Sequence, residues 1–216
     1  MYYESQKRHI LDYWKSSGLV TGKAVIRAFQ SVPREFFVPD NYRGQAYGDY
    51  PLPIPAGQTI SQPTTVMIIT QALELGKGMK VLEVGAGSGY QAAVIAQIVG
   101  KKGRVYATEI IPELAAFAAA NLRRAGISNV EVINWDGSRG YGPAAPYDRI
   151  VVSAACREIP SPLIEELKDG GILVAPVGPS FGQVLTRVRK CDGKLSYETL
   201  GDFMFVPLTG GHGYGP

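Results

Sequence analysis

Apolar and polar positions follow two different periods through the middle of the chain. Short apolar runs that are typical of β-strands lie at residues 79–85, 104–110, 129–135, 147–155 and 170–178. Helix-length segments follow three of these runs, at residues 91–100, 112–126 and 160–170. Apolar strands that alternate with helices are typical of a parallel sheet that is covered on both faces. We therefore predict a doubly wound α/β core over residues 79–178.

The two ends of the chain depart from this alternation. Residues 179–216 alternate in polarity around Asp192-Gly193, which predicts an antiparallel hairpin added to the sheet. Residues 1–78 predict helices at 4–16, 22–31 and 63–75, with a proline-rich stretch before the last one. We expect this N-terminal arm to cover one rim of the sheet and the active site. A length of 216 residues suits one domain, 1–216, with these three parts.

Composition and charge exclude several classes of protein. The content of 45% hydrophobic and 19% charged residues is ordinary for a globular protein. The net charge of +3 is scattered rather than gathered in a basic stripe, so we expect no nucleic-acid partner. The isolated Cys156 and Cys191 support neither a disulfide framework nor a metal site. Charges near the N-terminus and the lack of a long apolar run indicate a cytoplasmic protein with no membrane segment.

The segment VLEVGAGSGY places three glycines, Gly85, Gly87 and Gly89, directly after a strand and before a helix. A glycine turn at this point lets a ligand approach bare backbone. A merely structural turn is the competing interpretation. The spacing is GxGxG rather than the GxGxxG of pyrophosphate-binding loops, which disfavours a nucleotide-linked dehydrogenase.

Glu109 ends the strand that follows the glycine turn, 24 residues after Gly85. An acidic side chain at this place can accept hydrogen bonds from both ribose hydroxyls of an adenosine. An exposed carboxylate at the end of a strand is the alternative, and the glycine turn beside it favours the binding role.

The series E-x-G-x-G-x-G followed by a strand-end acid resembles the first two motifs of S-adenosylmethionine-dependent methyltransferases with a Rossmann-like fold. This resemblance implies a sulfonium cofactor without phosphate, and S-adenosylhomocysteine as its product. It also implies that Glu83 lies near the loop that receives the methionine part. Asp136, with Gly137 beside it, would reach the adenine amino group, although Asp136 in WDGSRG is alternatively a turn former.

Segments on both sides of the glycine turn carry a second, more specific resemblance. FVP near Phe37, AYGDYPLPIPAGQTISQP, DGSRGYGPAAPYDRIVVSAA, LKDGGILVAPVG and FVPLTG together resemble protein-L-isoaspartate (D-aspartate) O-methyltransferases, from about Val32 to Thr209. Trp135 departs from the family, which usually has glycine there. The resemblance implies methyl transfer to the free α-carboxylate of L-isoaspartyl residues in damaged proteins, which initiates repair through a succinimide. We expect a monomer.

The uncharged stretch PLPIPAGQTISQPTT, residues 51–65, suits such an acceptor. A carboxylate with a pKa near 3.5–4 is already a nucleophile at neutral pH, so no general base is required. By the same resemblance Ser61 is the active-site serine, Thr59 and Ile60 face the cofactor or acceptor, and Thr209 closes over the site. Ser61 is alternatively the N-cap of the next helix.

Tyr47, Asp49 and the PLPIP run are predicted to bind the substrate peptide in extended form, with a rigid structural loop as the alternative. Three further functions compete with repair. Two are methyl transfer to a small molecule or to RNA, and the lack of basic or aromatic runs disfavours RNA. The third is a non-catalytic methyltransferase-like binding module, and the intact glycine turn, Glu109 and Ser61 argue against it.

Overall fold

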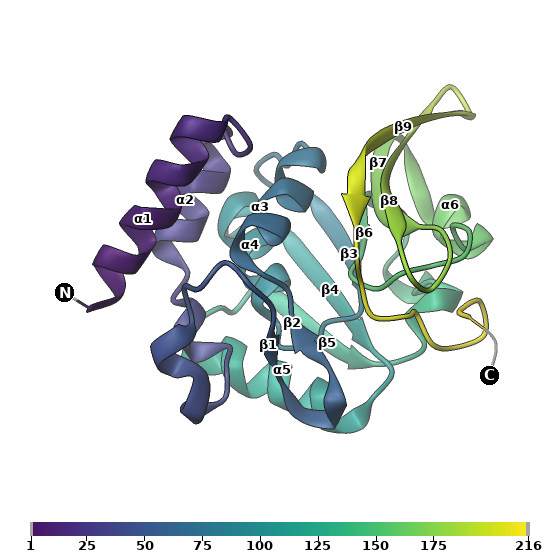
Figure 1. Ribbon diagram of the computed structural model, residues 1–216. Coiled ribbons are helices and arrows are strands. Elements are labelled where there is room, and N and C mark those ends of the chain that lie inside the picture. Colours follow the sequence, from purple (N-terminus) through teal and green to yellow (C-terminus); the bar gives the residue numbers. More distant parts are fainter. Residues whose placement is uncertain (1, 215–216) are drawn as a thin grey trace.

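The computed structural model describes residues 2–214, which build a seven-stranded sheet with helices packed against it (Figure 1). The strand order is β5-β4-β3-β6-β7-β8-β9. The first five strands in this order are parallel, and the last two pairs are antiparallel. The strands are β3 (Lys80–Val84), β4 (Arg104–Glu109), β5 (Val130–Asn134), β6 (Tyr147–Val152), β7 (Leu167–Val177), β8 (Gln183–Cys191) and β9 (Lys194–Phe203). The predicted α/β fold with its C-terminal hairpin is confirmed.

Helices bury both faces of the sheet. They are α3 (Pro63–Ala72), α4 (Tyr90–Val99), α5 (Pro112–Arg124) and α6 (Ser161–Glu166), with short 3-10 turns η4 (Gly137–Arg139) and η5 (Gly142–Ala144). Successive side chains of a strand point to opposite faces. Val81 of β3 accordingly packs in one cluster with Ile95 of α4, whereas Leu82 packs in another cluster with Leu163 of α6.

The chain changes direction across the sheet at β3. From β3 it passes to β4 and β5 on one side, and later to β6 and β7 on the other. In open α/β sheets, ligands bind outside the carboxyl ends of the strands at such a switch point. The loop that follows β3, residues 85–89, lies at this position.

The N-terminal arm packs on the outer side of α4. It contains α1 (Tyr2–Ser17), α2 (Lys23–Ser31), η1 (Arg34–Phe36), η2 (Asp40–Gln45), β1 (Leu52–Pro53), η3 (Pro55–Gly57) and β2 (Thr59–Ile60). Trp14 and Phe29 share one buried cluster with Val94 and Ile98 of α4. β1 and β2 form a small antiparallel pair that the sequence did not predict, and it carries residues 59 and 60 toward the switch point. No helix within residues 2–214 is long and apolar enough to cross a bilayer.

The predicted hairpin turn is confirmed at Asp192-Gly193. Cys191 pairs with Lys194 across it, and the two turn residues have φ values of 50° and 71°. Two successive positive φ values match the right-handed twist of the flanking strands, and Asp-Gly adopts them readily.

The predicted helix at 160–170 is wrong in its second half. α6 ends at Glu166, and Leu167 already pairs with Tyr147 of β6. The register then shifts, so that Ile172 pairs with Arg149. Pairing buries Leu167 against the sheet, and this tertiary contact outweighs a local helix preference. β6 also ends at Val152, three residues before the predicted end of the strand.

Candidate active site

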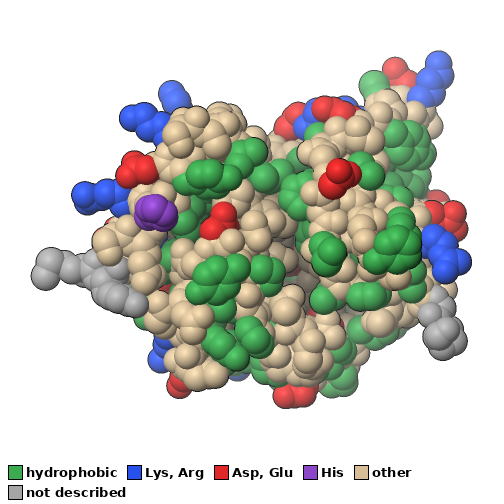
Figure 2. Space-filling model, viewed as in Figure 1, with side chains coloured by type: hydrophobic (Ala, Val, Ile, Leu, Met, Phe, Trp, Pro, Cys, Tyr) green, Lys and Arg blue, Asp and Glu red, His purple; other side chains and the backbone are tan. Residues whose placement is uncertain are grey.

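One pocket opens at the carboxyl ends of β3, β4 and β6. Figure 2 shows the surface hollowed between the N-terminal helices and the C-terminal hairpin, with Lys and Arg side chains at the periphery of this face. Four segments supply most of the wall: residues 58–61, 83–91, 108–114 and 205–209. The charged residues among those that line it are Glu83 and Glu109, so the pocket is acidic.

The three glycines of the turn have two different roles, in lining the pocket and in helix packing. Gly85 and Gly87 line the pocket with φ values of 91° and 53°, and the N–H groups of Gly85 and Ala86 both donate to the Thr108 carbonyl at 2.9 Å. Such φ values favour glycine. Gly89 is not among the lining residues: a Cβ there would lie 3.3 Å from the Ala118 carbonyl oxygen of α5, so this glycine permits close helix packing.

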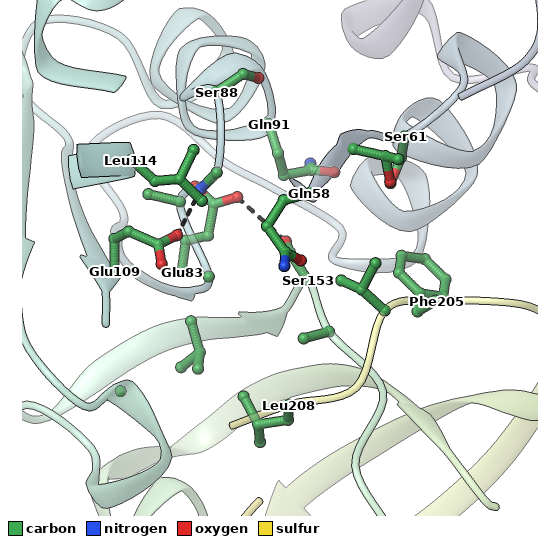
Figure 3. Close-up of a pocket in the computed structure, with 18 of the residues that line it drawn as sticks. Gln58, Ser61, Glu83, Ser88, Gln91, Glu109, Leu114, Ser153, Phe205 and Leu208 are labelled. Atoms are coloured by element: carbon green, nitrogen blue, oxygen red, sulfur yellow. Dashed lines mark hydrogen bonds between the residues drawn. The ribbon is translucent and has the colours of Figure 1, made fainter. Parts of the chain in front are cut away.

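Backbone donors hold Glu109 in a fixed orientation at the pocket. Its Oε2 accepts from the N–H of Gly87 at 2.9 Å (Figure 3). Its Oε1 accepts from the N–H of Ile111 at 3.0 Å. Each carboxylate oxygen keeps a further lone pair. The side chain is therefore preorganised to accept hydrogen bonds from a diol such as ribose.

Glu83 is a fully buried carboxyl group at the same end of the sheet. Ser153 donates to its Oε1 at 3.1 Å (Figure 3), whereas Oε2 is buried without a hydrogen-bond partner. Burial raises the pKa of Glu83 to about 8, Ser153 opposes this rise, and the nearby Glu109 adds to it. A buried acid with an unused oxygen suits a cationic ligand group, whose charge would favour the carboxylate.

Thr59, Ile60 and Ser61 line the side of the pocket formed by the arm, and Figure 3 shows Ser61 across the pocket from Glu109. The N-cap of α3 is Gln62, and its side chain makes no capping hydrogen bond. The interpretation of Ser61 as the N-cap is therefore wrong. Its hydroxyl has no hydrogen-bond partner within residues 2–214 and is free to meet a ligand.

Asp49, which was predicted to bind the substrate peptide, caps the helix in place of Ser61, although it lies 15 residues before Thr64. It is not among the residues that line the pocket. Its carboxylate accepts from the Thr64 N–H at 2.9 Å and from the Thr64 hydroxyl at 2.6 Å. The indole N–H of Trp14 donates to the same hydroxyl oxygen at 2.8 Å. These bonds anchor the start of α3, and hence the residues just before it, to the arm.

The segment after β9 closes the pocket. Thr209 lines it as predicted, together with Phe205 and Leu208. The Phe205 N–H donates to the Gln183 side chain at 2.8 Å, and the Leu208 N–H donates to the Ala155 carbonyl at 2.7 Å. Residues from opposite ends of the chain thus form facing walls.

The structure separates Asp136 from Gly137. Gly137 lines the pocket, and a Cβ there would lie 2.1 Å from Thr108 Oγ1, so glycine alone fits. Asp136 is not among the lining residues. Its Oδ1 accepts from Ser138, and its Oδ2 accepts from Arg139 and the Gly211 N–H. Burial alone would raise the pKa of Asp136, but the bonds from Ser138 and Gly211 lower it. Its carboxylate serves the turn, as the alternative interpretation states.

Tyr47 does not reach the pocket. Its side chain is 3% exposed, its hydroxyl donates to Glu35 at 2.6 Å, and the Arg34 N–H donates to the same hydroxyl at 3.1 Å. The predicted contact with a substrate peptide is replaced by a packing role, because the arm folds over this ring.

Ser153 and Phe205 are pocket residues that the sequence analysis missed. Ser153 directly follows β6, the neighbour of β3, so the rule that ligands bind at the carboxyl ends of strands would have indicated it. Phe205 reaches the site only through the return of the chain after the hairpin, and no local signal marks it. Residues 2–214 contain no group of three or more His, Cys, Asp or Glu side chains that could hold a metal ion.

The geometry of the site indicates the class of ligand that the protein binds. A glycine turn and a diol-binding acid beside a second, buried acid suit a nucleoside that carries positive charge, as S-adenosylmethionine does. The fold agrees with this class. The structure is similar to one from Plasmodium falciparum described as a beta-aspartate methyltransferase (PCMT) in complex with S-adenosyl-L-homocysteine, with a TM-score of 0.83 and 25% identity over 93% of this chain and 97% of that one.

The sequence comparisons name the family. Residues 5–213 match the family model of protein-L-isoaspartate(D-aspartate) O-methyltransferase. The chain is 49% identical to the protein-L-isoaspartate O-methyltransferase of Pyrococcus horikoshii, over 98% of this chain and 96% of that protein. It is 50% identical to the enzyme of the same name from Staphylothermus marinus, over 98% and 97%. The chain belongs to the protein-L-isoaspartate O-methyltransferase family.

Proposed function

We propose that this chain transfers the methyl group of S-adenosylmethionine to the free α-carboxylate of L-isoaspartyl residues in damaged proteins. The observation that carries this proposal is the pairing of an acidic cofactor side with a neutral wall that presents an unpartnered serine hydroxyl. Family membership supports the same reaction.

The chemistry requires alignment and no proton transfer by the protein. The acceptor carboxylate is already ionised at neutral pH. One of its oxygens forms a bond to the methyl carbon while the carbon–sulfur bond breaks, and the electron pair of that bond stays on sulfur. The products are a methyl ester and neutral S-adenosylhomocysteine. The adjacent backbone nitrogen then attacks the ester carbonyl, methanol leaves, and a succinimide forms. Addition of water opens the ring and returns some normal aspartyl linkage.

Four residues and the backbone of Gly137 have proposed roles on the cofactor side of the pocket. Glu109 accepts hydrogen bonds from the ribose hydroxyls, and Gly85 and Gly87 allow the close approach of the cofactor. Glu83 offers its unpartnered oxygen to the cationic methionine part. The backbone of Gly137, rather than the Asp136 carboxylate, faces the adenine edge.

On the acceptor side, the Ser61 hydroxyl binds the carboxylate, with Thr59 and Ile60 beside it. Thr209 closes the pocket from the C-terminal segment. A positive side chain here would bind the carboxylate but also lower its nucleophilicity and repel the sulfonium.

A paired-peptide assay tests the proposed function. The protein is incubated with methyl-labelled S-adenosylmethionine and one of two peptides that differ only in an isoaspartyl or a normal aspartyl linkage. We expect a base-labile label on the isoaspartyl peptide alone. Equal labelling of both peptides overturns the assignment. Binding of S-adenosylhomocysteine without labelling of either peptide indicates a non-catalytic module.

We also propose a cytoplasmic monomer without a nucleic-acid partner. Cys156 is buried and Cys191 is exposed, and both are free thiols, which suits a reducing compartment. Sedimentation analysis at micromolar concentration tests the monomer, and a dimer mass contradicts it.

A further inference from the structure

Arg34 is a completely buried guanidinium in the arm, in η1 between α2 and η2. Its Nε donates to the Ala46 carbonyl at 2.6 Å, and its Nη2 donates to the Ser61 carbonyl at 2.8 Å. The guanidinium carbon also lies 4.8 Å from the centre of the Tyr90 ring, in cation–π geometry. Burial lowers the pKa of Arg34 to about 10, so the group stays charged at neutral pH.

These contacts join two walls of the pocket. Ser61 lies on the acceptor side, and Tyr90 is the first residue of α4, directly after the glycine turn. Both residues line the pocket, whereas Arg34 lies behind them and is not among the lining residues. Arg34 therefore connects Ser61 directly to Tyr90, the residue that follows the glycine turn.

The burial of the Arg34 charge is not explained by a stabilising ion pair. Within residues 2–214 no carboxylate lies in ion-pair contact with it, and its Nη1 is buried without a hydrogen-bond partner. The carboxylate of the nearby Asp49 accepts hydrogen bonds from Thr64 instead. A buried charge without an ion-pair contact is costly in free energy. The contacts that the charge does make are with the backbone of the acceptor loop and the ring beside the cofactor loop.

We propose that Arg34 is a positioning residue for methyl transfer, which sets the distance between the acceptor held by Ser61 and the methyl group above the glycine turn. This inference rests on the proposed function. Arg34 acts through the Ser61 carbonyl and the Tyr90 ring and does not touch the substrate. The proposed anchors of the cofactor, Glu109 and Glu83, lie on β4 and β3, and their hydrogen bonds within residues 2–214 are with Gly87, Ile111 and Ser153 rather than with Arg34.

This arrangement predicts a loss that is confined to the chemical step. A displacement of about 1 Å between reacting groups costs roughly 100-fold in rate. In Arg34→Lys one ammonium cannot reach both carbonyls in the planar geometry of the guanidinium. We expect kcat on the isoaspartyl peptide to fall about 10- to 100-fold. The Kd of S-adenosylhomocysteine should stay within about twofold, because its anchors are intact.

Arg149→Lys is the matched control. Arg149 is also buried, and it also binds backbone carbonyls, those of Leu73, Asp148 and Glu74. Arg149 belongs to β6, and its side chain binds the backbone just after the C-terminal end of α3; it is not among the residues that line the pocket. We expect this variant to keep kcat within about twofold, because its hydrogen bonds do not involve the acceptor loop or the cofactor loop.

The outcomes separate the two proposals. A kcat of Arg34→Lys within twofold of the parent, or a parallel loss of S-adenosylhomocysteine binding, overturns the positioning role. Failure of the unaltered protein to label the isoaspartyl peptide overturns the proposed function instead, and this inference with it. If Arg34→Lys does not fold, Tyr90→Leu removes the ring face and leaves both hydrogen bonds. The same selective loss of kcat is expected there, and its absence overturns the role.

Discussion

At the scale of single residues, the site depends on which polar atoms remain unused. Within residues 2–214 the Ser61 hydroxyl and Glu83 Oε2 have no hydrogen-bond partner, whereas the Asp136 carboxylate accepts hydrogen bonds from Ser138, Arg139 and Gly211. Unused polar groups beside a pocket are the ones that a ligand can satisfy. This difference supports the proposed binding roles of the first two residues, whereas the carboxylate of the third holds the turn and the C-terminal segment.

Ser61→Ala tests the acceptor side. Because the hydroxyl makes no bond within residues 2–214, we expect the Tm to stay within about 1 °C of the parent. We expect kcat on the isoaspartyl peptide to fall about 10-fold or more, and the Kd of S-adenosylhomocysteine to be unchanged. Steady-state kinetics and calorimetric titration measure these quantities. An unaltered kcat would show that the hydroxyl has no part in the reaction.

Glu83→Gln tests the buried acid through pH. The pKa of Glu83 is raised in the folded protein to about 8, so the folded state holds this proton more tightly than the unfolded state. The protonated Glu83 side chain therefore contributes to the free energy of unfolding at low pH, and this contribution is lost as pH rises toward 8. Without ligand, Glu83→Gln should therefore raise the free energy of unfolding at pH 8 by at least about 1 kcal/mol. It should make little difference near pH 4.5.

Denaturant titrations at the two pH values measure this difference. The same substitution should weaken S-adenosylmethionine binding, because a neutral amide replaces the carboxylate that meets the cation. Stability gains of equal size at both pH values would contradict the assigned cause.

At the scale of elements, α3 is placed by residues far from it in sequence. Asp49 and Trp14 bind Thr64 in its first turn, and Arg34 binds the loop just before it. The β1–β2 pair adds a second constraint by matching Leu52 with Ile60. The acceptor wall is therefore a rigid part of the arm.

Asp49→Ala should destabilise the protein as the loss of a helix cap does, by about 0.5–2 kcal/mol. For a chain of this size each kcal/mol lowers the Tm by roughly 2–4 °C. Asp40→Ala is the control, because the Asp40 side chain is 83% exposed and pairs only with Arg43 at the surface. Thermal unfolding compares the two variants. Equal Tm values would show that Asp49 does not hold the helix start.

At the scale of the whole molecule, the pocket is formed where three parts of the chain meet. The arm supplies Ser61, the sheet supplies Glu83 and Glu109, and the segment after β9 supplies Phe205 and Thr209. Because no single part contains the site, a ligand bound there stabilises all three together.

S-adenosylhomocysteine should therefore raise the Tm of the whole protein in one transition. At a ligand concentration of 100 times Kd, the stabilisation is about 2.7 kcal/mol. This corresponds to a rise of roughly 5–10 °C for a chain of this size. Glu109→Ala should abolish most of the rise at the same concentration. Calorimetry measures both, and a full rise in the variant would remove Glu109 from the cofactor site.

Local patterns were sufficient for the series of elements in the core. Alternating apolar runs predicted β3 to β7, and Asp192-Gly193 predicted the turn of the hairpin. Gly85, Gly87 and Glu109 were found because a glycine turn and a strand-end acid have a characteristic spacing. Leu167 was assigned to the wrong element because its strand pairing with Tyr147 depends on a distant segment.

The sequence by itself determined the α/β series and the turn geometry, because φ preferences and hydrophobic period act within a few residues. Only the tertiary structure decided that Asp49 caps α3, that Asp136 binds the C-terminal segment and that Tyr47 is buried. It also placed Arg34 between Ser61 and Tyr90. The physical reason is that the partner of a polar side chain is set by which distant segments pack beside it.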